Sequence, residues 1–347
     1  MIREHQAPSG AFVASPSLPS YRYSWLRDGA FIADAMSRVG ETESAEAFYR
    51  WCSGVVEARA DRIAALVERG RGGEQIERGE HLHCRYTVDG REYEGEWSSF
   101  QLDGYGSWLW ALGEHARRHG ASSAPFAQGA ALSVRYVAEF WAEPCFDWWE
   151  ERWGRHTTTL ASVYAGLAAA REWEELPAET REQADRAAGK ITAAIRAEAV
   201  VAGRLGGELG DARLDASLLA CATPFRAVEP GEPVTAATVA ALEETIAHGG
   251  VHRYLGDTYY GGGEWLLLAA FLGWWYAEVG RPEDARRQLE WIEQRAGPKG
   301  DLPEQVDEHV LSLEGLREWT DRWGPSPSPL LWSHAMYLTL ADELGVT

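Results

Sequence analysis

The chain has 347 residues, of which 45% are hydrophobic, so it is long enough to bury a large core. It carries 33 Lys and Arg residues against 53 Asp and Glu residues, and its formal net charge is −20. No basic cluster stands out, so this negative field excludes polyanions such as nucleic acids as partners and leaves neutral ligands unaffected.

The sequence also bears on location and cofactors. No stretch reaches about 18 consecutive apolar residues, so we expect no membrane span. The segment Met1–Gln6 lacks the apolar core of a secretory signal, which favours a cytoplasmic protein. The four cysteines have neither a C-x-x-C pair nor zinc-site spacing, and no HExxH motif is present. We therefore predict free thiols, no metal site and no cofactor.

Helical periodicity dominates the chain. Gly120 and Gly280 each follow an apolar-periodic segment, as glycines at helix C-termini do, and Pro282 suits the first turn of the next helix. The alternating stretch 81–97 contains Asp89-Gly90, which predicts one β-hairpin. About a dozen helices are predicted, near residues 27–39, 43–68, 102–119, 124–140, 156–172, 176–197, 212–221, 234–248, 263–280, 282–296, 307–318 and 329–344.

Twelve helices joined as α-hairpins can close into a double-layered ring, the (α/α)6 barrel. The absence of a tandem repeat of fixed period disfavours an open solenoid, and an irregular helical domain is the remaining alternative. We predict an all-α fold, a single (α/α)6 barrel domain over residues 1–347 with a small β-hairpin near 81–97. The longer connections of such a ring gather at one end, where a rigid scaffold can hold a site.

The segment Tyr21–Gly29 places an Arg–Asp pair behind three aromatic residues. Arg27 is a fixed fork of hydrogen-bond donors and Asp28 is an acceptor, so together they can grip vicinal hydroxyl groups. A structural ion pair that caps the first helix is the alternative interpretation.

Residues 147–151 combine three acids with two tryptophans. An acid beside bulky aromatic side chains loses solvation, which favours its protonated form, as a general acid requires. The alternative is that Glu150 and Glu151 form an acidic pair in the first turn of a helix that begins near His156.

A second acid, Glu304, lies far away in the sequence, in the segment Leu302–Asp307. Glycoside hydrolysis needs two carboxyl groups that flank the scissile bond, one to protonate the leaving oxygen and one to activate water or attack directly. Taken alone, Pro303-Glu304-Gln305 equally resembles an ordinary helix start.

Aromatic residues and glycines characterise a further segment, residues 252–265, which contains Arg253, Asp257 and Trp265. A phosphate-binding loop is disfavoured there, because the Lys-Ser/Thr ending and a preceding strand are missing. The chain also has 17 Trp residues, and indole faces are good platforms for sugar rings. A helical core rich in tryptophan is the alternative explanation for that number.

Taken in order, these segments resemble the motifs of the glucoamylase family, glycoside hydrolase family 15. The likeness runs from about residue 10 to about residue 340. It is carried by six segments: Tyr21–Gly29, Gln101–Gly106, Trp149-Glu150-Glu151 with Gly154 and His156, Arg253–Trp265, Pro303-Glu304-Gln305 and Pro329–Ala335.

The resemblance implies an (α/α)6 barrel that removes glucose from the non-reducing ends of α-glucans with inversion. It implies Glu150 as general acid and Glu304 as general base. It further implies that Arg27, Asp28 and Arg253 bind sugar hydroxyls, that Glu151 stands at the pocket wall, and that Gln305 lies near the attacking water. Tyr21, Trp25, Trp149 and Trp265 are then expected to line the pocket.

Some features leave the substrate open. Since the resemblance starts at the first barrel motif, we expect the N-terminal β-sandwich domain of bacterial and archaeal relatives to be absent. Leu26 stands where the family commonly has Pro, and Glu264 stands where Pro usually precedes the Trp. Malto-oligosaccharides are the favoured substrate. The alternatives are an isomalto- or dextran-type glucosidase, a trehalase, or a sugar-sensing domain without catalysis. The presence of both Glu150 and Glu304 argues against the last of these.

Overall fold

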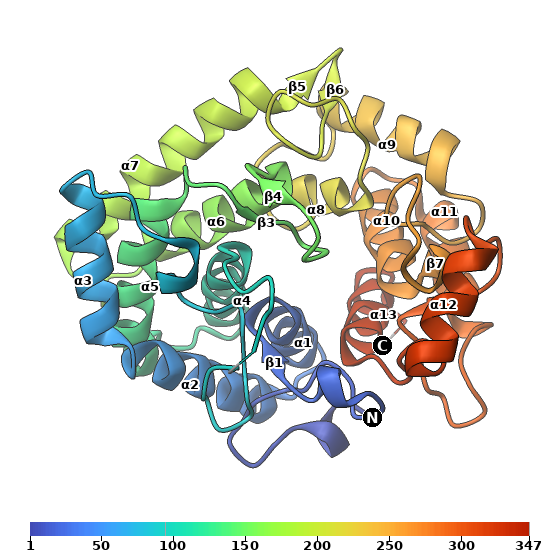
Figure 1. Cartoon of the computed structure of the whole chain (residues 1–347), viewed down its shortest axis with the longest axis horizontal. Coiled ribbons are helices and arrows are strands. Elements are labelled where there is room, and N and C mark those ends of the chain that lie inside the picture. Colours follow the sequence, from blue (N-terminus) through green and yellow to red (C-terminus); the bar gives the residue numbers. More distant parts are fainter. Residues whose placement is uncertain (94, 347) are drawn as a thin grey trace.

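The computed structural model describes residues 1–93 and 95–346, and helices make up most of it. Six of these helices form a closed inner ring, because each packs against the next and the last packs against the first. Figure 1 shows α1, α4, α10 and α13 near the centre of the molecule. In ring order the six are α1 (Leu26–Arg38), α4 (Asp103–His119), α6 (Thr157–Ala170), α8 (Leu219–Ala222), α10 (Leu266–Glu278) and α13 (Leu331–Glu343).

An outer layer of helices surrounds this ring, and α3, α7, α9 and α12 mark its periphery in Figure 1. Each inner helix except the last is followed by one or two outer helices before the chain returns to the ring, as in an (α/α)6 barrel, so the predicted fold class is confirmed. The outer helices are α2 (Thr42–Glu57), α3 (Ala60–Arg71), α5 (Ala127–Phe140), α7 (Ala178–Ala194), α9 (Pro233–Ile246), α11 (Pro282–Glu293) and α12 (Leu313–Trp323).

The hydrophobic pattern separates the two layers. The inner helix α10 reads LLLAAFLGWWYAE and is buried on nearly every side, whereas the outer helix α11 buries a single face. The inner helices α4 and α6 approach each other closely at Gly106 and Gly166. A Cβ atom on Gly106 would lie 2.4 Å from the carbonyl oxygen of Ser162, so only glycine permits this contact.

Aromatic side chains fill the middle of the inner ring. Phe31 lies at the centre of this cluster, with ring-centroid distances of 5.2–6.0 Å to Trp110, Trp148, Phe225, Phe271 and Trp332. Trp148 and Trp332 also line the large cavity described below. The top of the aromatic core is therefore the floor of that cavity.

Short antiparallel strands connect the loops at the ends of the barrel. They pair as β1 (Ser24–Trp25) with β2 (Arg85–Tyr86), β3 (Cys145–Phe146) with β4 (Trp153–Gly154), β5 (Val200–Val201) with β6 (Arg204–Leu205), and β7 (Glu264–Trp265) with β8 (Gln305–Val306). Of the hairpin predicted near 81–97, the described residues 81–93 and 95–97 show a tight turn with one bridge from Tyr86 to Glu92. Its strand β2 pairs with β1 instead, which joins this segment to the start of α1.

The largest differences between the predicted helices and the structure occur in three segments. The segment 43–68 is divided into α2 and α3, the segment 212–221 contains only the short α8 after a 3-10 turn, and α12 begins six residues later than the predicted 307–318. Within the described residues, no helix combines the length and apolar character that crossing a bilayer requires. The four cysteines are buried and unbridged.

Candidate active site

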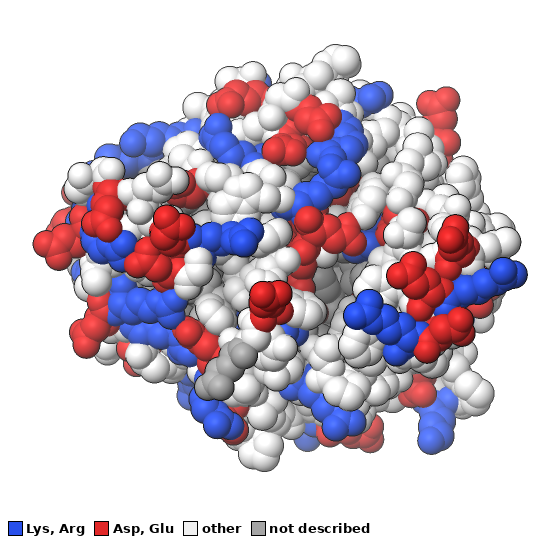
Figure 2. Space-filling model, in the orientation of Figure 1, with Lys and Arg blue, Asp and Glu red and all other residues white. Residues whose placement is uncertain are grey.

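A cavity of about 1360 Å³ opens at the end of the barrel where the inner helices begin. Its wall comes from segments that precede or start α1, α4, α6, α10 and α13. Figure 2 shows a hollow near the middle of this face, with acidic and basic side chains around it. The inner ring thus brings together, on one rigid frame, segments that lie far apart in the sequence.

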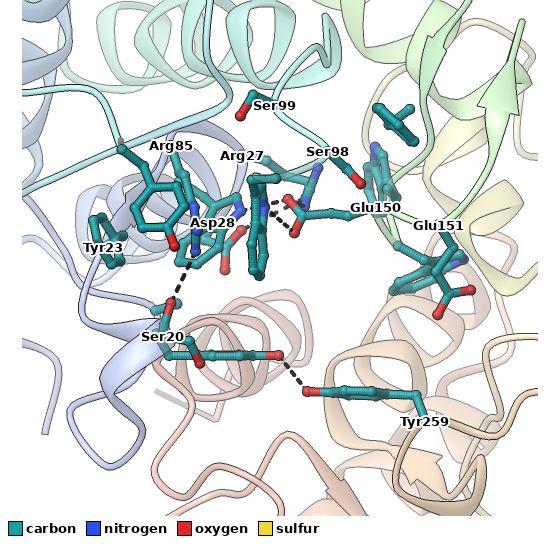
Figure 3. A pocket seen from close by; sticks show the side chains of 18 of the residues that line it. Ser20, Tyr23, Arg27, Asp28, Arg85, Ser98, Ser99, Glu150, Glu151 and Tyr259 are labelled. Carbon is teal, nitrogen blue, oxygen red and sulfur yellow. Dashed lines mark hydrogen bonds and ion pairs between the residues drawn. The ribbon is translucent and has the colours of Figure 1, made fainter. Parts of the chain in front are cut away.

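The predicted site residues converge on this cavity, and Figure 3 shows several of them around its open space. Of the predicted side chains, only Gln305 is absent from the wall. The others that line it are Tyr21, Trp25, Arg27, Asp28, Trp149, Glu150, Glu151, Arg253, Trp265 and Glu304.

Glu150 lies in the tight connection between β3 and β4, outside any helix. The interpretation of Glu150 and Glu151 as a first-turn acidic pair is therefore wrong. The carboxylate of Asp147 accepts hydrogen bonds from the backbone N–H groups of Glu151 (2.8 Å) and Arg152 (3.1 Å) and so closes the turn. Glu150 itself adopts φ = 65°, a left-handed conformation that costs a non-glycine residue about 1–2 kcal/mol.

The carboxylate of Glu150 is held by nitrogen donors. The indole of Trp25 (2.7 Å) and the amide of Gln101 (2.8 Å) donate to Oε1, and the indole of Trp97 (2.9 Å) donates to Oε2. The thiol of Cys84 lies 3.7 Å from Oε1. These contacts fix the plane of the carboxyl group against the cavity.

Glu304 lines the same cavity in a different environment. Its side chain is buried, and the hydroxyl of Tyr21 donates to Oε1 at 2.9 Å. Oε2 has no hydrogen-bond partner among the described residues. Burial raises the pKa of Glu304 to about 7, although the hydrogen bond from Tyr21 and the charge of Arg253 oppose this rise. Near neutral pH the group can therefore both accept and release a proton.

Arg27 and Asp28 lie beside Glu150, as Figure 3 shows. Arg27 donates from Nη1 to Gln101 (2.9 Å) and to Asp103 (2.8 Å), and its Nη2 lies 3.9 Å from Oε1 of Glu150. Burial raises the pKa of Asp28 to about 7, the charge of Arg27 lowers it, and the charge of Glu150 adds to the rise. The first helix thus presents a paired guanidinium and carboxyl group to the cavity.

A second guanidinium group, that of Arg253, borders the cavity from the segment before α10. It forms a two-point hydrogen bond with Asp257, at 2.7 and 2.6 Å, and donates to Glu151 at 2.9 Å. Its carbon Cζ lies 5.2 and 5.3 Å from the ring centroids of Trp149 and Trp265. Carboxylates and indole rings therefore hold this guanidinium group in place at the cavity wall.

The side-chain amide of Gln305 forms hydrogen bonds to the backbone. Its Oε1 accepts from the N–H of Gly263 at 2.8 Å, and its Nε2 donates to the carbonyl of Tyr259 at 3.2 Å. Both ends of the amide are thus occupied by the backbone of the glycine-rich segment. Pro303-Glu304-Gln305 also leads into β8 and does not start a helix, because Gln305 pairs with Trp265 of β7.

Sequence reasoning missed several residues of the site. Trp97 and Gln101 both bond to Glu150, the hydroxyl of Tyr259 lies 2.6 Å from that of Tyr21, and Asp215 accepts from the indole of Trp149 at 2.8 Å. Gln101 and Tyr259 lie inside the segments Gln101–Gly106 and Arg253–Trp265, but no spacing in the sequence indicates their contacts. The tryptophan count was a useful signal, since eight of the 17 tryptophans line the cavity.

Comparison with known proteins agrees with this geometry. The isomaltose glucohydrolase of Kribbella flavida is 43% identical over 350 residues, which cover 100% of this chain and 91% of that protein. A solved wild-type glycosidase superimposes with a TM-score of 0.96 at 42% identity, covering 99% of this chain and 94% of that one. The glucoamylase of Saccharomycopsis fibuligera shares the fold, with a TM-score of 0.75 at 15% identity over 97% of this chain and 89% of its own.

The sequence profile of glycosyl hydrolases family 15 matches residues 1–342. The ring of six inner helices and the cavity at its end, which contains both Glu150 and Glu304, are consistent with this match. The chain therefore belongs to glycosyl hydrolases family 15 and is a glycoside hydrolase.

Proposed function

We propose that this enzyme is an inverting, exo-acting α-glucosidase that releases β-glucose from isomaltose and short related glucosides. Glu150 acts as general acid and Glu304 as general base. The observation that carries this proposal is the carboxyl pair in one cavity. Nitrogen donors hold the carboxyl group of Glu150, and Glu304 is buried with one carboxylate oxygen unpartnered.

We derive the reaction from the different surroundings of Glu150 and Glu304. Glu150 gives its proton to the glycosidic oxygen as the bond to the anomeric carbon breaks, and the bonding electron pair stays on the leaving oxygen. On the opposite face of the sugar, Oε2 of Glu304 takes a proton from a water molecule whose oxygen attacks the anomeric carbon. Inversion needs space for that water, so the two carboxyl groups are expected to lie roughly 6.5–9.5 Å apart.

The shape of the cavity supports removal of terminal sugars. Trp148 and Trp332 belong to the buried aromatic core and close the cavity at its floor, so a glucan can enter by an end but cannot pass through. A volume of about 1360 Å³ exceeds the roughly 300–1,000 Å³ of ordinary ligand pockets and leaves space beyond one glucose.

The preference for isomaltose rests on relatedness. The isomaltose glucohydrolase of Kribbella flavida matches along the whole of this chain and 91% of its own length. This revises the expectation of malto-oligosaccharides, which rested on resemblance to glucoamylases in general. A panel of isomaltose, maltose, maltotriose, trehalose and dextran tests the proposal, with glucose release and NMR of the anomeric proton as readouts.

Initial release of β-glucose, fastest from isomaltose, is the expected result. Faster release of glucose from maltose or trehalose would contradict the proposed preference for isomaltose. Initial release of α-glucose would contradict the proposed inversion. Binding of glucose without cleavage of any substrate would point to the sugar-sensing alternative.

The pH dependence of activity should reflect Glu304. A general base must be ionised, and its pKa lies at about 7 in the free enzyme. Below pH 7 the ionised fraction falls about tenfold per pH unit, so kcat/KM for isomaltose should fall with the same limiting slope. A pH profile of kcat/KM measures this, and a flat profile between pH 4.5 and 7 would contradict the role of Glu304.

Substitution of Arg27→Ala should weaken both catalysis and folding. Loss of charge-assisted hydrogen bonds to sugar hydroxyls should lower kcat/KM by at least about 30-fold, or about 2 kcal/mol. Asp103, which is fully buried, would also lose its cationic partner, which should lower the melting temperature. Arg117→Ala is the matched control, since Arg117 pairs with Glu114 on the exposed side of α4 and should change neither value.

A further inference from the structure

Gln101 is fully buried immediately before α4 and connects two parts of the site. Its Oε1 accepts from Nη1 of Arg27 at 2.9 Å. Its Nε2 donates to Oε1 of Glu150 and to the carbonyl oxygen of Ser98, both at 2.8 Å. One amide group thus joins the sugar-binding guanidinium to the carboxyl group proposed as general acid.

The neighbours of this amide decide which way it points. A guanidinium group can only donate, so the atom that faces Arg27 must be the amide oxygen. A carbonyl oxygen can only accept, so the atom that faces Ser98 must be the NH₂ group. Gln101 is therefore an obligatory donor to Glu150.

Oε1 of Glu150 then faces two obligatory donors, because the indole N–H of Trp25 also donates to it, at 2.7 Å. The thiol of Cys84 also donates to Oε1, at 3.7 Å, so among the described residues a proton on Oε1 would point at donor hydrogens. Among the same residues, Oε2 accepts a hydrogen bond only from the indole of Trp97, at 2.9 Å, and retains room for its own hydrogen.

From this geometry we infer that Gln101 is a positioning residue that keeps the transferable proton of Glu150 on Oε2. The inference rests on the proposed role of Glu150 as general acid. As that proton moves to the glycosidic oxygen, Glu150 becomes a carboxylate. The N–H groups of Gln101 and Trp25 already point at Oε1, so they stabilise the negative charge as it forms.

Leaving groups that differ in their need for protonation test this inference. The alkoxide leaving group of isomaltose requires a proton, whereas the fluoride of α-glucosyl fluoride departs with little help. Gln101→Leu removes the donor, and a hydrogen bond to a charged group contributes roughly 1.5–3 kcal/mol. We expect kcat/KM for isomaltose to fall roughly 10- to 100-fold further than kcat/KM for α-glucosyl fluoride.

The values of kcat/KM for isomaltose and for α-glucosyl fluoride are measured on the same protein sample. Unfolded molecules lower both values by the same factor, so partial unfolding of a variant does not change their ratio. Gln128→Leu, on an exposed turn of the outer helix α5, is the matched control and should leave both rates unaltered. If Gln101→Leu does not fold, Gln101→Glu serves instead, because it keeps an acceptor for Arg27 and removes the amide donor.

Two outcomes separate the inference from the function on which it rests. An equal fall for both substrates in the Gln101 variant would overturn the positioning role while wild-type hydrolysis of isomaltose still supports the enzyme's proposed function. Failure of the wild-type protein to hydrolyse isomaltose would overturn that proposed function itself, and maltose would replace isomaltose in the test.

Discussion

Replacement of Glu150 by Gln should stop the hydrolysis of isomaltose and leave the protein folded. The amide has nearly the same shape but cannot supply the proton that the leaving oxygen needs. We expect kcat to fall roughly 10²- to 10⁴-fold, the usual contribution of a general acid. Steady-state glucose release and a thermal melt, measured on the same preparation, check the two parts of this expectation.

The surroundings of Glu150 explain why the fold should survive. Oxygen at the Oε1 position would still accept from Trp25 and Gln101. The new NH₂ group would face the indole N–H of Trp97, which is partly exposed and can turn away. Glu179→Gln on the exposed side of α7 is the control. A variant at position 150 that retains most of its activity would remove Glu150 from the acid role.

Loss of the second carboxyl group should be equally severe for a different reason. Glu304→Ala removes the group that accepts the proton of the attacking water, so turnover of isomaltose should again fall roughly 10²- to 10⁴-fold. Azide is an anion and needs no base, so its addition should restore turnover and yield β-glucosyl azide. Product analysis by NMR checks this. A product of α configuration, or no rescue together with normal sugar binding, would contradict the assignment.

The same residue should oppose stability at alkaline pH. The pKa of Glu304 is about 7 in the folded protein and near 4.5 when the group is solvated, a difference worth at most about 3 kcal/mol. Because the folded pKa is the higher one, this destabilisation is absent below pH 4.5 and complete above pH 7. Glu304→Gln stays neutral, so its melting temperature should exceed that of the parent at pH 8 and match it at pH 4. An equal difference at both values would rule out this explanation.

The sequence predicted the barrel well because the outer helices show a helical period of apolar residues, whereas inner helices such as α10 are nearly continuous apolar segments of helical length. It predicted boundaries less well where tertiary contacts override that period. The break between α2 and α3 falls at Arg59, whose guanidinium reaches Glu92 and the carbonyl of Gly90 on a distant loop. No pattern in the sequence around Arg59 indicates that it contacts this distant loop.

The candidate site shows the same contrast between features that the local sequence predicts and features that tertiary contacts decide. Individual acids and arginines could be selected because their chemistry is distinctive and their motifs are specific. Contacts such as those of Trp97, Gln101 and Asp215 depend on how separate loops meet, which the sequence leaves open. Gln305 is a further example, since the sequence does not indicate that its amide bonds to the backbone of Gly263 and Tyr259.

The closure of the inner ring has a consequence for how activity is acquired during synthesis. Tyr21 and Glu304 bond to each other across 283 positions of the chain. The loop that carries Glu304 is held by α13, where Ser333 donates to the carbonyl of Pro303 and His334 accepts from the N–H of Leu302. Since α13 also packs on α1, the position of Glu304, the proposed base, depends on the contact that closes the inner ring. We therefore expect a nascent chain to be inactive until α13 has docked against α1, however many of its other helices have already formed.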